Sequence, residues 1–161
     1  MTNREIKFNI EVYDSINELA EDDAFLLNQA RSVTQFAYAP YSNFLVGAFA
    51  KLVNGENVSG TNQENASFPA GICAERTLIS TASSLFPGIG IETLAISYHN
   101  LKGNSGSPVS PCGICRQSLM EFQERTNQPI RIVLGGMEGE VLIIEDAKYL
   151  LPLVFGAEDM R

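Results

Sequence analysis

Three cysteines constrain the fold of this chain more than any other feature of its sequence. Cys73 stands alone, and Cys112 and Cys115 form a C-x-x-C pair beyond the intervening residues 74–111. An odd number of cysteines does not suit a disulfide framework and fits a metal or catalytic site better. Both motifs fall at predicted helix starts, where unpaired N–H groups and the helix dipole favour thiolate over thiol. If the three sulfurs share one metal ion, the fold must bring two helix N-termini together.

Helical and strand patterns alternate along most of the chain. Hydrophobic periodicity predicts helices over residues 22–38, 73–86 and 111–125. Strands are predicted over residues 46–53, 56–61, 91–98, 130–134 and 141–144. The first two strands form a hairpin that turns at Asn54 and Gly55, and the apolar third strand suits a sheet covered on both faces. The pattern therefore predicts an α/β fold with a layered, mixed sheet.

The N-terminal residues carry a different pattern. Apolar and polar side chains alternate over residues 5–13, which predicts a half-buried strand on a sheet edge or on a partner subunit. A chain of 161 residues is long enough for one core but not for two. We therefore predict a single domain over residues 1–161, with an N-terminal extension over 1–21 and a core over 22–161.

The composition of the chain limits the kinds of partner that it can bind. It carries 11 Lys and Arg residues against 19 Asp and Glu residues, a formal net charge of −8. Nucleic-acid binders usually show a basic footprint, so a small-molecule substrate is predicted instead. No apolar stretch approaches the roughly 20 residues that span a bilayer, and the first ten residues carry charges where a signal peptide would be apolar. We expect a cytoplasmic protein with neither a membrane nor a nucleic-acid partner.

Three thiolates from two helix starts fill three corners of a zinc tetrahedron. Structural zinc sites normally have four protein ligands, whereas catalytic sites leave one position for water. The chain has no fourth cysteine, and its one histidine, His99, has no ligand-like spacing to either motif. We favour three protein ligands plus water. Two interpretations stay open from the cysteines alone: a structural zinc with His99 or a carboxylate as fourth ligand, and a redox pair.

Two charged residues that follow Cys73 bear on this choice. Glu75 can turn toward the open position without binding the metal, and there a carboxylate can take a proton from water and pass it to a substrate. The alternative role is that of a first-turn glutamate stabilised by the helix dipole. Arg76 can donate to a thiolate and so restore Lewis acidity to a zinc ion that carries three thiolates. Arg116 is a second candidate for that role.

These motifs resemble those of a known family. C-A-E at residues 73–75 and P-C-G-I-C-R-Q at 111–117 resemble the signature of the zinc-dependent nucleoside and nucleobase deaminases. The segments YAPYSNFLVGA (38–48), GTNQENASFPAGICAERT (60–77) and LLPLVFG (150–156) are similar to the small homotetrameric cytidine deaminases. The likeness runs from about residue 28 to 159. It implies a three-layer α-β-α sandwich with a mixed, roughly five-stranded sheet, to which the N-terminal strand is an addition.

The resemblance also implies roles at the metal centre. Cys73, Cys112 and Cys115 would hold one Zn²⁺ per subunit. Glu75 would shuttle protons, and Arg76 would lie against the metal ligands.

Further residues would bind the substrate according to the same resemblance. Asn62 and Glu64 would hydrogen-bond the ribose hydroxyls, and an amide and a carboxylate can recognise a diol where apolar groups cannot. Phe44 would pack on the pyrimidine face. Ala66 and Ala74 would offer backbone contacts.

Two phenylalanines concern the boundary between subunits. Phe155 would reach into the site of a neighbouring subunit of a homotetramer. Phe68 departs from the family pattern, because many relatives carry a tyrosine there whose hydroxyl helps to bind the sugar. Phenylalanine keeps the packing and loses the donor.

The expected reaction is the hydrolytic deamination of cytidine and 2′-deoxycytidine to the uridine products and ammonia, a step of pyrimidine salvage. A blasticidin-type deaminase shares both cysteine motifs, but the N-Q-E sequence at residues 62–64 argues against it. A polynucleotide-editing deaminase is disfavoured by the acidic balance and by C-x-E in place of H-x-E. A zinc-stabilised binding module without turnover is the alternative from another class of protein, and an activity assay separates it.

Overall fold

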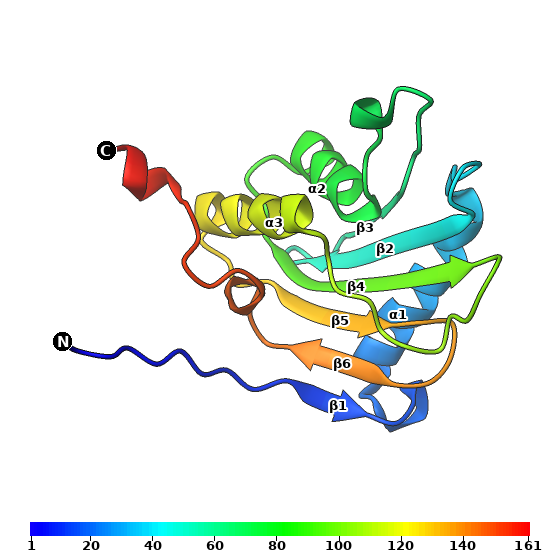
Figure 1. Ribbon diagram of the computed structural model, residues 1–161, viewed down its shortest axis with the longest axis horizontal. Helices are drawn as coiled ribbons and strands as arrows, with labels where there is room; N and C mark the ends of the chain where they lie inside the picture. Colours follow the sequence, from blue (N-terminus) through cyan, green and yellow to red (C-terminus); the bar gives the residue numbers. More distant parts are fainter.

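A six-stranded mixed sheet forms the middle of the computed structural model, which describes residues 1–161 (Figure 1). Its strands are β1 (Glu11–Tyr13), β2 (Phe44–Leu52), β3 (Asn57–Thr61), β4 (Ile91–Asn100), β5 (Arg131–Gly135) and β6 (Val141–Ile144). They lie in the order β1-β6-β5-β4-β2-β3. Only β4 and β5 run parallel, and the chain passes between them through a helix, as a parallel crossover requires.

Three helices cover the two faces of this sheet. α1 (Glu21–Val33) packs on one face, and α2 (Ala74–Leu85) and α3 (Gly113–Thr126) pack on the other. Short 3-10 turns complete the chain at Ile16–Glu18, Thr34–Phe36, Phe68–Ala70, Ala147–Leu150 and Ala157–Met160. The three-layer α-β-α sandwich with a mixed sheet is therefore confirmed.

β4 lies between two apolar cores, and this position accounts for its continuous run of apolar residues. Leu94 and Ile96 face the larger core beneath α2 and α3, whereas Ala95 faces the smaller core beneath α1. A strand buried on both faces reads as a continuous apolar run, as was predicted. Each fully buried Leu or Ile stabilises the fold by about 1.5–3 kcal/mol relative to an exposed one, so the sheet is a rigid base for the residues at its ends.

The N-terminal strand is shorter than predicted. Only Glu11–Tyr13 pair with β6, in the register Glu11 to Ile143 and Tyr13 to Val141. Residues 1–10 have no strand partner, and the prediction of a strand from residue 5 was wrong over that part. The physical reason is that β6 has four residues and ends at Ile144, one residue beyond the partner of Glu11, so residues 5–9 have no strand residue opposite them.

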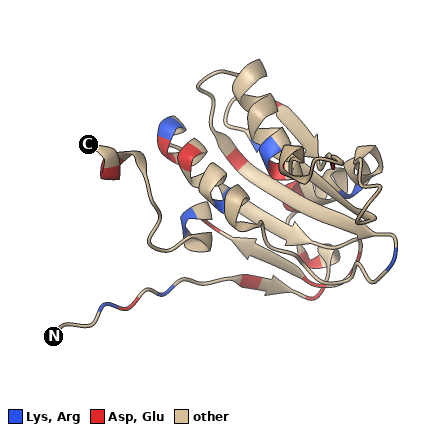
Figure 2. Ribbon diagram, turned by 45° about the horizontal axis from the view of Figure 1, so that its top comes forward, with Lys and Arg blue, Asp and Glu red and all other residues tan.

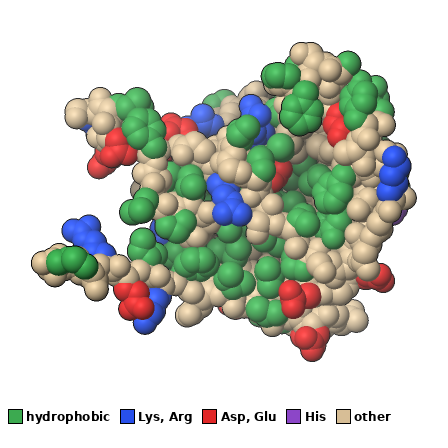
Figure 3. Space-filling view, viewed as in Figure 1, with side chains coloured by type: hydrophobic (Ala, Val, Ile, Leu, Met, Phe, Trp, Pro, Cys, Tyr) green, Lys and Arg blue, Asp and Glu red, His purple; other side chains and the backbone are tan.

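Both termini lie on the same side of the molecule, and the segments that lead to them project from its body (Figure 1). Figure 3 shows apolar side chains on both projecting segments. Phe8 of the N-terminal segment stacks on Tyr149 with ring centroids 5.4 Å apart. In the C-terminal segment, Leu153 and Phe155 are exposed.

Charged residues are dispersed over the fold. Figure 2 shows Lys and Arg side by side with Asp and Glu and no basic stripe. Several of the basic groups are neutralised locally, as when Arg131 pairs with Asp23 and Glu145. None of the helices combines the length and the apolar character of a transmembrane span.

Candidate active site

The three cysteines meet where α2 and α3 begin. Cys73 and Cys112 are the N-cap residues of the two helices, and Cys115 lies in the first turn of α3. The Sγ atoms of Cys73 and Cys112 are 3.9 Å apart, those of Cys112 and Cys115 are 3.5 Å apart, and all three lie within 4.8 Å of one another. Sulfurs on two corners of a zinc tetrahedron stand about 3.8 Å apart for Zn–S bonds of about 2.3 Å. The donor set and its spacing therefore fit one Zn²⁺.

The predicted start of α3 was wrong by two residues. The helix was predicted to begin at residue 111, whereas Cys112 is the N-cap and the helix begins at Gly113. The shift matters because it places Cys112 at the helix end itself, in the same position as Cys73 on α2. The two thiols thus face each other across two helix N-termini.

A close contact between α2 and β3 holds Cys73 in place. A Cβ atom at Gly60 of β3 would stand 2.4 Å from the Ala74 carbonyl oxygen and 2.4 Å from the Leu78 backbone nitrogen. Only glycine permits such an approach of helix to strand. The first turn of α2, with Cys73 and Glu75, is therefore fixed against the sheet.

The pKa values of Cys73 and Cys115 are shifted in opposite directions. Hydrogen bonding from Cys115, helped by that from Cys112 and by the charge of Arg76, lowers the pKa of Cys73 to about 6. The hydrogen bond with Cys73, together with burial, raises the pKa of Cys115. The lowered pKa favours the thiolate form of Cys73 even without a metal ion, whereas Cys115 must lose a proton when an ion binds.

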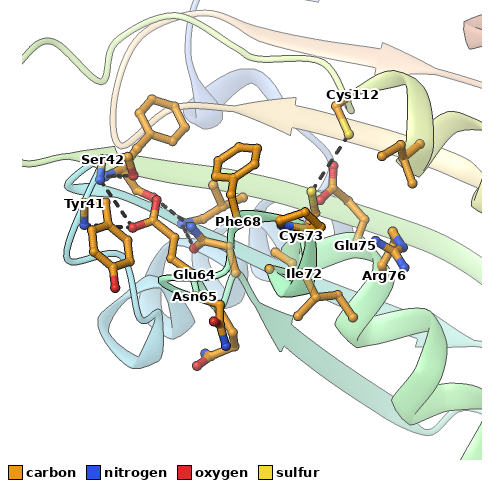
Figure 4. Close-up of a pocket in the computed structure, with 18 of the residues that line it drawn as sticks. Tyr41, Ser42, Glu64, Asn65, Phe68, Ile72, Cys73, Glu75, Arg76 and Cys112 are labelled. Atoms are coloured by element: carbon orange, nitrogen blue, oxygen red, sulfur yellow. Dashed lines mark hydrogen bonds between the residues drawn. The ribbon is translucent and has the colours of Figure 1, made fainter.

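Glu75 lies beside this cluster at the end of a cavity. It is 5% exposed, and burial raises the pKa of its carboxyl group. Figure 4 shows the carboxylate turned toward the sulfurs of Cys73 and Cys112. A buried carboxylate with a raised pKa beside a metal site is suited to general acid–base catalysis, in which it accepts a proton and returns it.

The cavity has a volume of about 860 Å³, within the range of sites that bind small molecules. Its two ends differ in chemistry: the sulfur cluster and Glu75 occupy one end, and Glu64 with Tyr41 and Ser42 occupies the other (Figure 4). Most of the wall between them is apolar, with Phe44, Val46 and Ile96 among its members.

Two polar residues are fixed at the second end. The Asn62 amide accepts a hydrogen bond from the Val46 N–H at 2.7 Å and donates one to the Phe44 carbonyl at 2.9 Å. The Glu64 carboxylate accepts hydrogen bonds from the N–H groups of Tyr41 and Ser42. Both side chains are therefore positioned before any ligand arrives.

Nearly all of the residues predicted for the site meet around this cavity. Those that line it are Phe44, Asn62, Glu64, Ala66, Cys73, Ala74, Glu75, Arg76 and Cys112, and Cys115 joins them through the sulfur cluster. Phe155 does not: its ring is 61% exposed outside the cavity, and its carbonyl accepts a hydrogen bond from Gln117.

Alternatives left open by the sequence are narrowed by the same geometry. His99 lies on the same face of β4 as Ala95 and so faces α1, away from the sulfur cluster, which excludes it as a fourth metal ligand. Arg116 donates to the carbonyls of Pro111 and Leu150 and is occupied in joining α3 to the C-terminal segment. Arg76 remains the arginine whose charge acts on Cys73.

The chain is similar to proteins of one family. Residues 20–128 match the model of the cytidine and deoxycytidylate deaminase zinc-binding region. The chain is 35% identical over 140 residues to a cytidine deaminase of Halalkalibacterium halodurans, a match that covers 87% of this chain and 98% of that protein. It is 36% identical over 140 residues to a cytidine deaminase of Mycobacterium tuberculosis, covering 84% and 90%.

Solved structures agree with this similarity. The crystal structure of a cytidine deaminase from Burkholderia pseudomallei has a TM-score of 0.71 at 34% identity and covers 85% of this chain and 100% of that chain. The crystal structure of the cytidine deaminase from Mycobacterium tuberculosis has a TM-score of 0.66 at 30% identity and covers 85% and 99%.

Proposed function

Because the chain belongs to the cytidine and deoxycytidylate deaminase family, we propose that it converts cytidine and 2′-deoxycytidine to the uridine nucleosides and ammonia by zinc-dependent hydrolysis. One observation carries this proposal: a three-thiol cluster and a buried carboxylate lie at one end of a cavity whose other end presents an amide and a carboxylate. The first end suits the chemistry of an aminopyrimidine ring. The second suits a sugar diol.

The proposed metal ligands are Cys73, Cys112 and Cys115, which leave one tetrahedral position without a protein donor. Zinc held by these residues would supply a water molecule with a pKa lowered toward about 7. Arg76 offsets part of the negative charge of the three thiolates from the cavity side. The site therefore pairs an activated water with a group that can move its proton.

Glu75 is proposed to be that group. It removes a proton from the attacking water as oxygen adds to C4 of the cytosine ring, and it delivers the proton to N3. It then carries the remaining proton of the C4 hydroxyl to the exocyclic amine, the C4–N bond breaks as the C4 carbonyl forms, and ammonia leaves. The addition makes C4 tetrahedral, so contacts that form only in this state lower the barrier.

The remaining contacts orient the nucleoside. Phe44 packs on the ring, Asn62 and Glu64 bind the ribose hydroxyls, and Ala66 and Ala74 present backbone groups. The positions of these residues around one cavity support these roles. The fixed amide of Asn62 supports its role further, because a preorganised polar group loses little entropy on binding.

Assembly is part of the proposal. We infer a homotetramer in which Phe155 enters the site of a neighbouring subunit, supported by its exposed ring on a projecting segment (Figure 1). Phe68 lines the cavity and is 91% exposed, and a neighbouring subunit of the tetramer would cover it as well. Light scattering on active protein tests the assembly, and a monomer that turns over at full rate would contradict the shared site.

The proposal extends to the domain boundary and the compartment of the protein. We propose that residues 1–21 are an extension of a catalytic core over residues 22–161, and removal of residues 1–10 should leave turnover intact. The proposed compartment is the cytoplasm, where thiols such as Cys112 stay reduced.

The decisive experiment is a spectrophotometric assay of the purified, zinc-loaded protein. Cytidine should lose its absorbance as uridine forms, with release of one ammonia per nucleoside. Competition between cytidine and blasticidin identifies a blasticidin-type enzyme. Bound zinc without turnover of either compound would support a binding module and overturn the proposed reaction.

A further inference from the structure

Tyr98 lies directly behind Phe44, on the side of that ring away from the cavity. The two rings are parallel within 11° and their centroids are 4.7 Å apart. Phe44 lines the cavity and is half-buried, whereas Tyr98 is 5% exposed and lies outside the set of lining residues. The wall against which a ligand would pack is therefore two aromatic layers thick at this point.

The sheet register produces this arrangement. In the antiparallel pair of β2 and β4, Val46 stands opposite Tyr98 and Phe44 stands opposite Asn100. Residues two apart share a face, so Phe44 and Tyr98 are diagonal neighbours within reach of aromatic side chains. Phe44 is also the first residue of its strand, and no earlier strand residue braces its ring.

The backbone of Phe44 is held separately from its ring. The Asn62 amide binds the Phe44 carbonyl and the Val46 N–H, which fixes the strand at this point. That clamp leaves the side-chain torsions of Phe44 free. The stack on Tyr98 is a contact that restrains the plane of the ring.

We propose that Tyr98 is a positioning residue that holds the Phe44 ring in the orientation needed to pack on a pyrimidine. This inference rests on the proposed function, because it assigns Phe44 to the base of the nucleoside. Tyr98 touches no substrate atom and acts through Phe44 alone. Its loss should therefore weaken nucleoside binding and leave the chemical step, which depends on Glu75 and the sulfur cluster, nearly unchanged.

The test compares three single variants with the wild-type, zinc-loaded protein. Tyr98→Leu removes the ring but keeps an apolar side chain, Tyr98→Phe keeps the ring, and Phe49→Leu is the control. Phe49 lies on the opposite face of β2, where it packs edge to face on Phe25 at 6.3 Å. The control therefore removes an aromatic pair from the same strand without touching the cavity.

Three quantities are measured for each variant: KM and kcat for cytidine, the Kd of uridine by calorimetry, and the melting temperature. Tyr98→Leu should raise both KM and Kd by about three- to tenfold, the order expected for one aromatic pair, with kcat within about twofold of wild type. Tyr98→Phe should leave KM and Kd at their wild-type values. Phe49→Leu should lower the melting temperature without changing either.

A double-mutant cycle with Phe44→Leu separates positioning from general packing. Once Phe44 is gone, Tyr98→Leu should raise KM no further, since interacting residues are non-additive. Tyr98→Met serves in the same cycle if Tyr98→Leu does not fold. Unchanged KM and Kd in Tyr98→Leu, or an equal rise in Phe49→Leu, would overturn the inference while wild-type turnover still supports the proposed function. Wild-type protein that neither deaminates cytidine nor binds uridine would overturn both.

Discussion

The carboxylate of Glu64 accepts a hydrogen bond from the backbone N–H of Tyr41 at 2.9 Å. The N–H of Ser42 reaches the same oxygen at 3.3 Å. Hydrogen bonding from the Ser42 side chain, joined by these backbone groups and opposed by partial burial, lowers the pKa of Glu64. The carboxylate is therefore ionised and oriented at the end of the cavity, and its second oxygen keeps the capacity to accept from a sugar hydroxyl.

Replacement of Glu64 by glutamine should weaken cytidine binding. A hydrogen bond to a charged acceptor contributes about 1.5–3 kcal/mol, so KM should rise by about ten- to a hundredfold while kcat falls much less. Steady-state kinetics measure both. Glu56→Gln, at the exposed turn of the hairpin, is the matched control, and a KM for Glu64→Gln equal to that of the control would remove Glu64 from the sugar site.

Glu75→Gln should separate proton transfer from metal binding. The amide has nearly the same shape but cannot accept and return a proton, so kcat should fall by about 10²–10⁴-fold. Zinc content should stay at that of wild type, because Glu75 is not among the proposed ligands, and the melting temperature should not fall. Metal analysis and kinetics on the same preparation test this, and a kcat within tenfold of wild type would refute the shuttle.

Removal of zinc should abolish turnover and lower thermal stability. The proposed ligands come from two different helices, so a bound ion holds α2 and α3 together and its binding energy adds to folding. Treatment with a chelator, followed by metal analysis, an activity assay and a melting curve, measures both effects. Zn²⁺ should restore activity and Mg²⁺ should not, because thiolates select soft ions; full activity in demonstrably zinc-free protein would exclude a catalytic metal.

The sequence was sufficient for the sulfur cluster because its signals are local. Each cysteine motif precedes an apolar helical pattern, and helix starts are marked by short-range chemistry. The error of two residues at α3 shows the limit: Ser110 and Pro111 are good capping residues, yet the helix begins after Cys112. Capping preference indicates that a helix starts nearby and does not fix the residue.

Other parts of the site depend on pairings that no local pattern encodes. The contact of Tyr98 with Phe44 follows from the register of two strands about fifty residues apart along the chain, and the N–H groups of Tyr41 and Ser42 act through their backbone. The strand predicted from residue 5 fails for a similar reason. Its alternation was correct for a strand, but β6 is too short to pair with it.

Asp146 should make stability depend on pH in the acid range. Its carboxylate accepts from the Gln123 amide at 2.7 Å and the Lys148 N–H at 2.9 Å, and it pairs with the Lys148 ammonium. Burial acts to raise its pKa, but the hydrogen bonds from Lys148 and Gln123 outweigh burial and hold the pKa below its ordinary 3.8. A lowered pKa stabilises the fold above the unfolded value and loses that contribution as pH falls through the folded value.

Asp146→Asn should therefore destabilise the protein by about 1–3 kcal/mol at pH 7. The gap in stability between variant and wild type should narrow as the pH falls below about 4. Chemical denaturation across this range measures both, with Glu140→Gln at an exposed position as the control. A gap that stays constant with pH would show that the ionised form of Asp146 contributes nothing.

Gly136→Ala should disturb the loop that leads into the metal site. A Cβ atom at Gly136 would stand 1.8 Å from the Ser105 carbonyl oxygen, which accepts a hydrogen bond from Met137. The loop must shift, and its later residues line the cavity before Cys112, so stability should fall by about 1–3 kcal/mol and KM should rise. Gly113→Ala adds the same methyl group where no atom lies within 4 Å and should match wild type. Equal melting temperatures and KM values for the two variants would show that the loop is not anchored at Gly136.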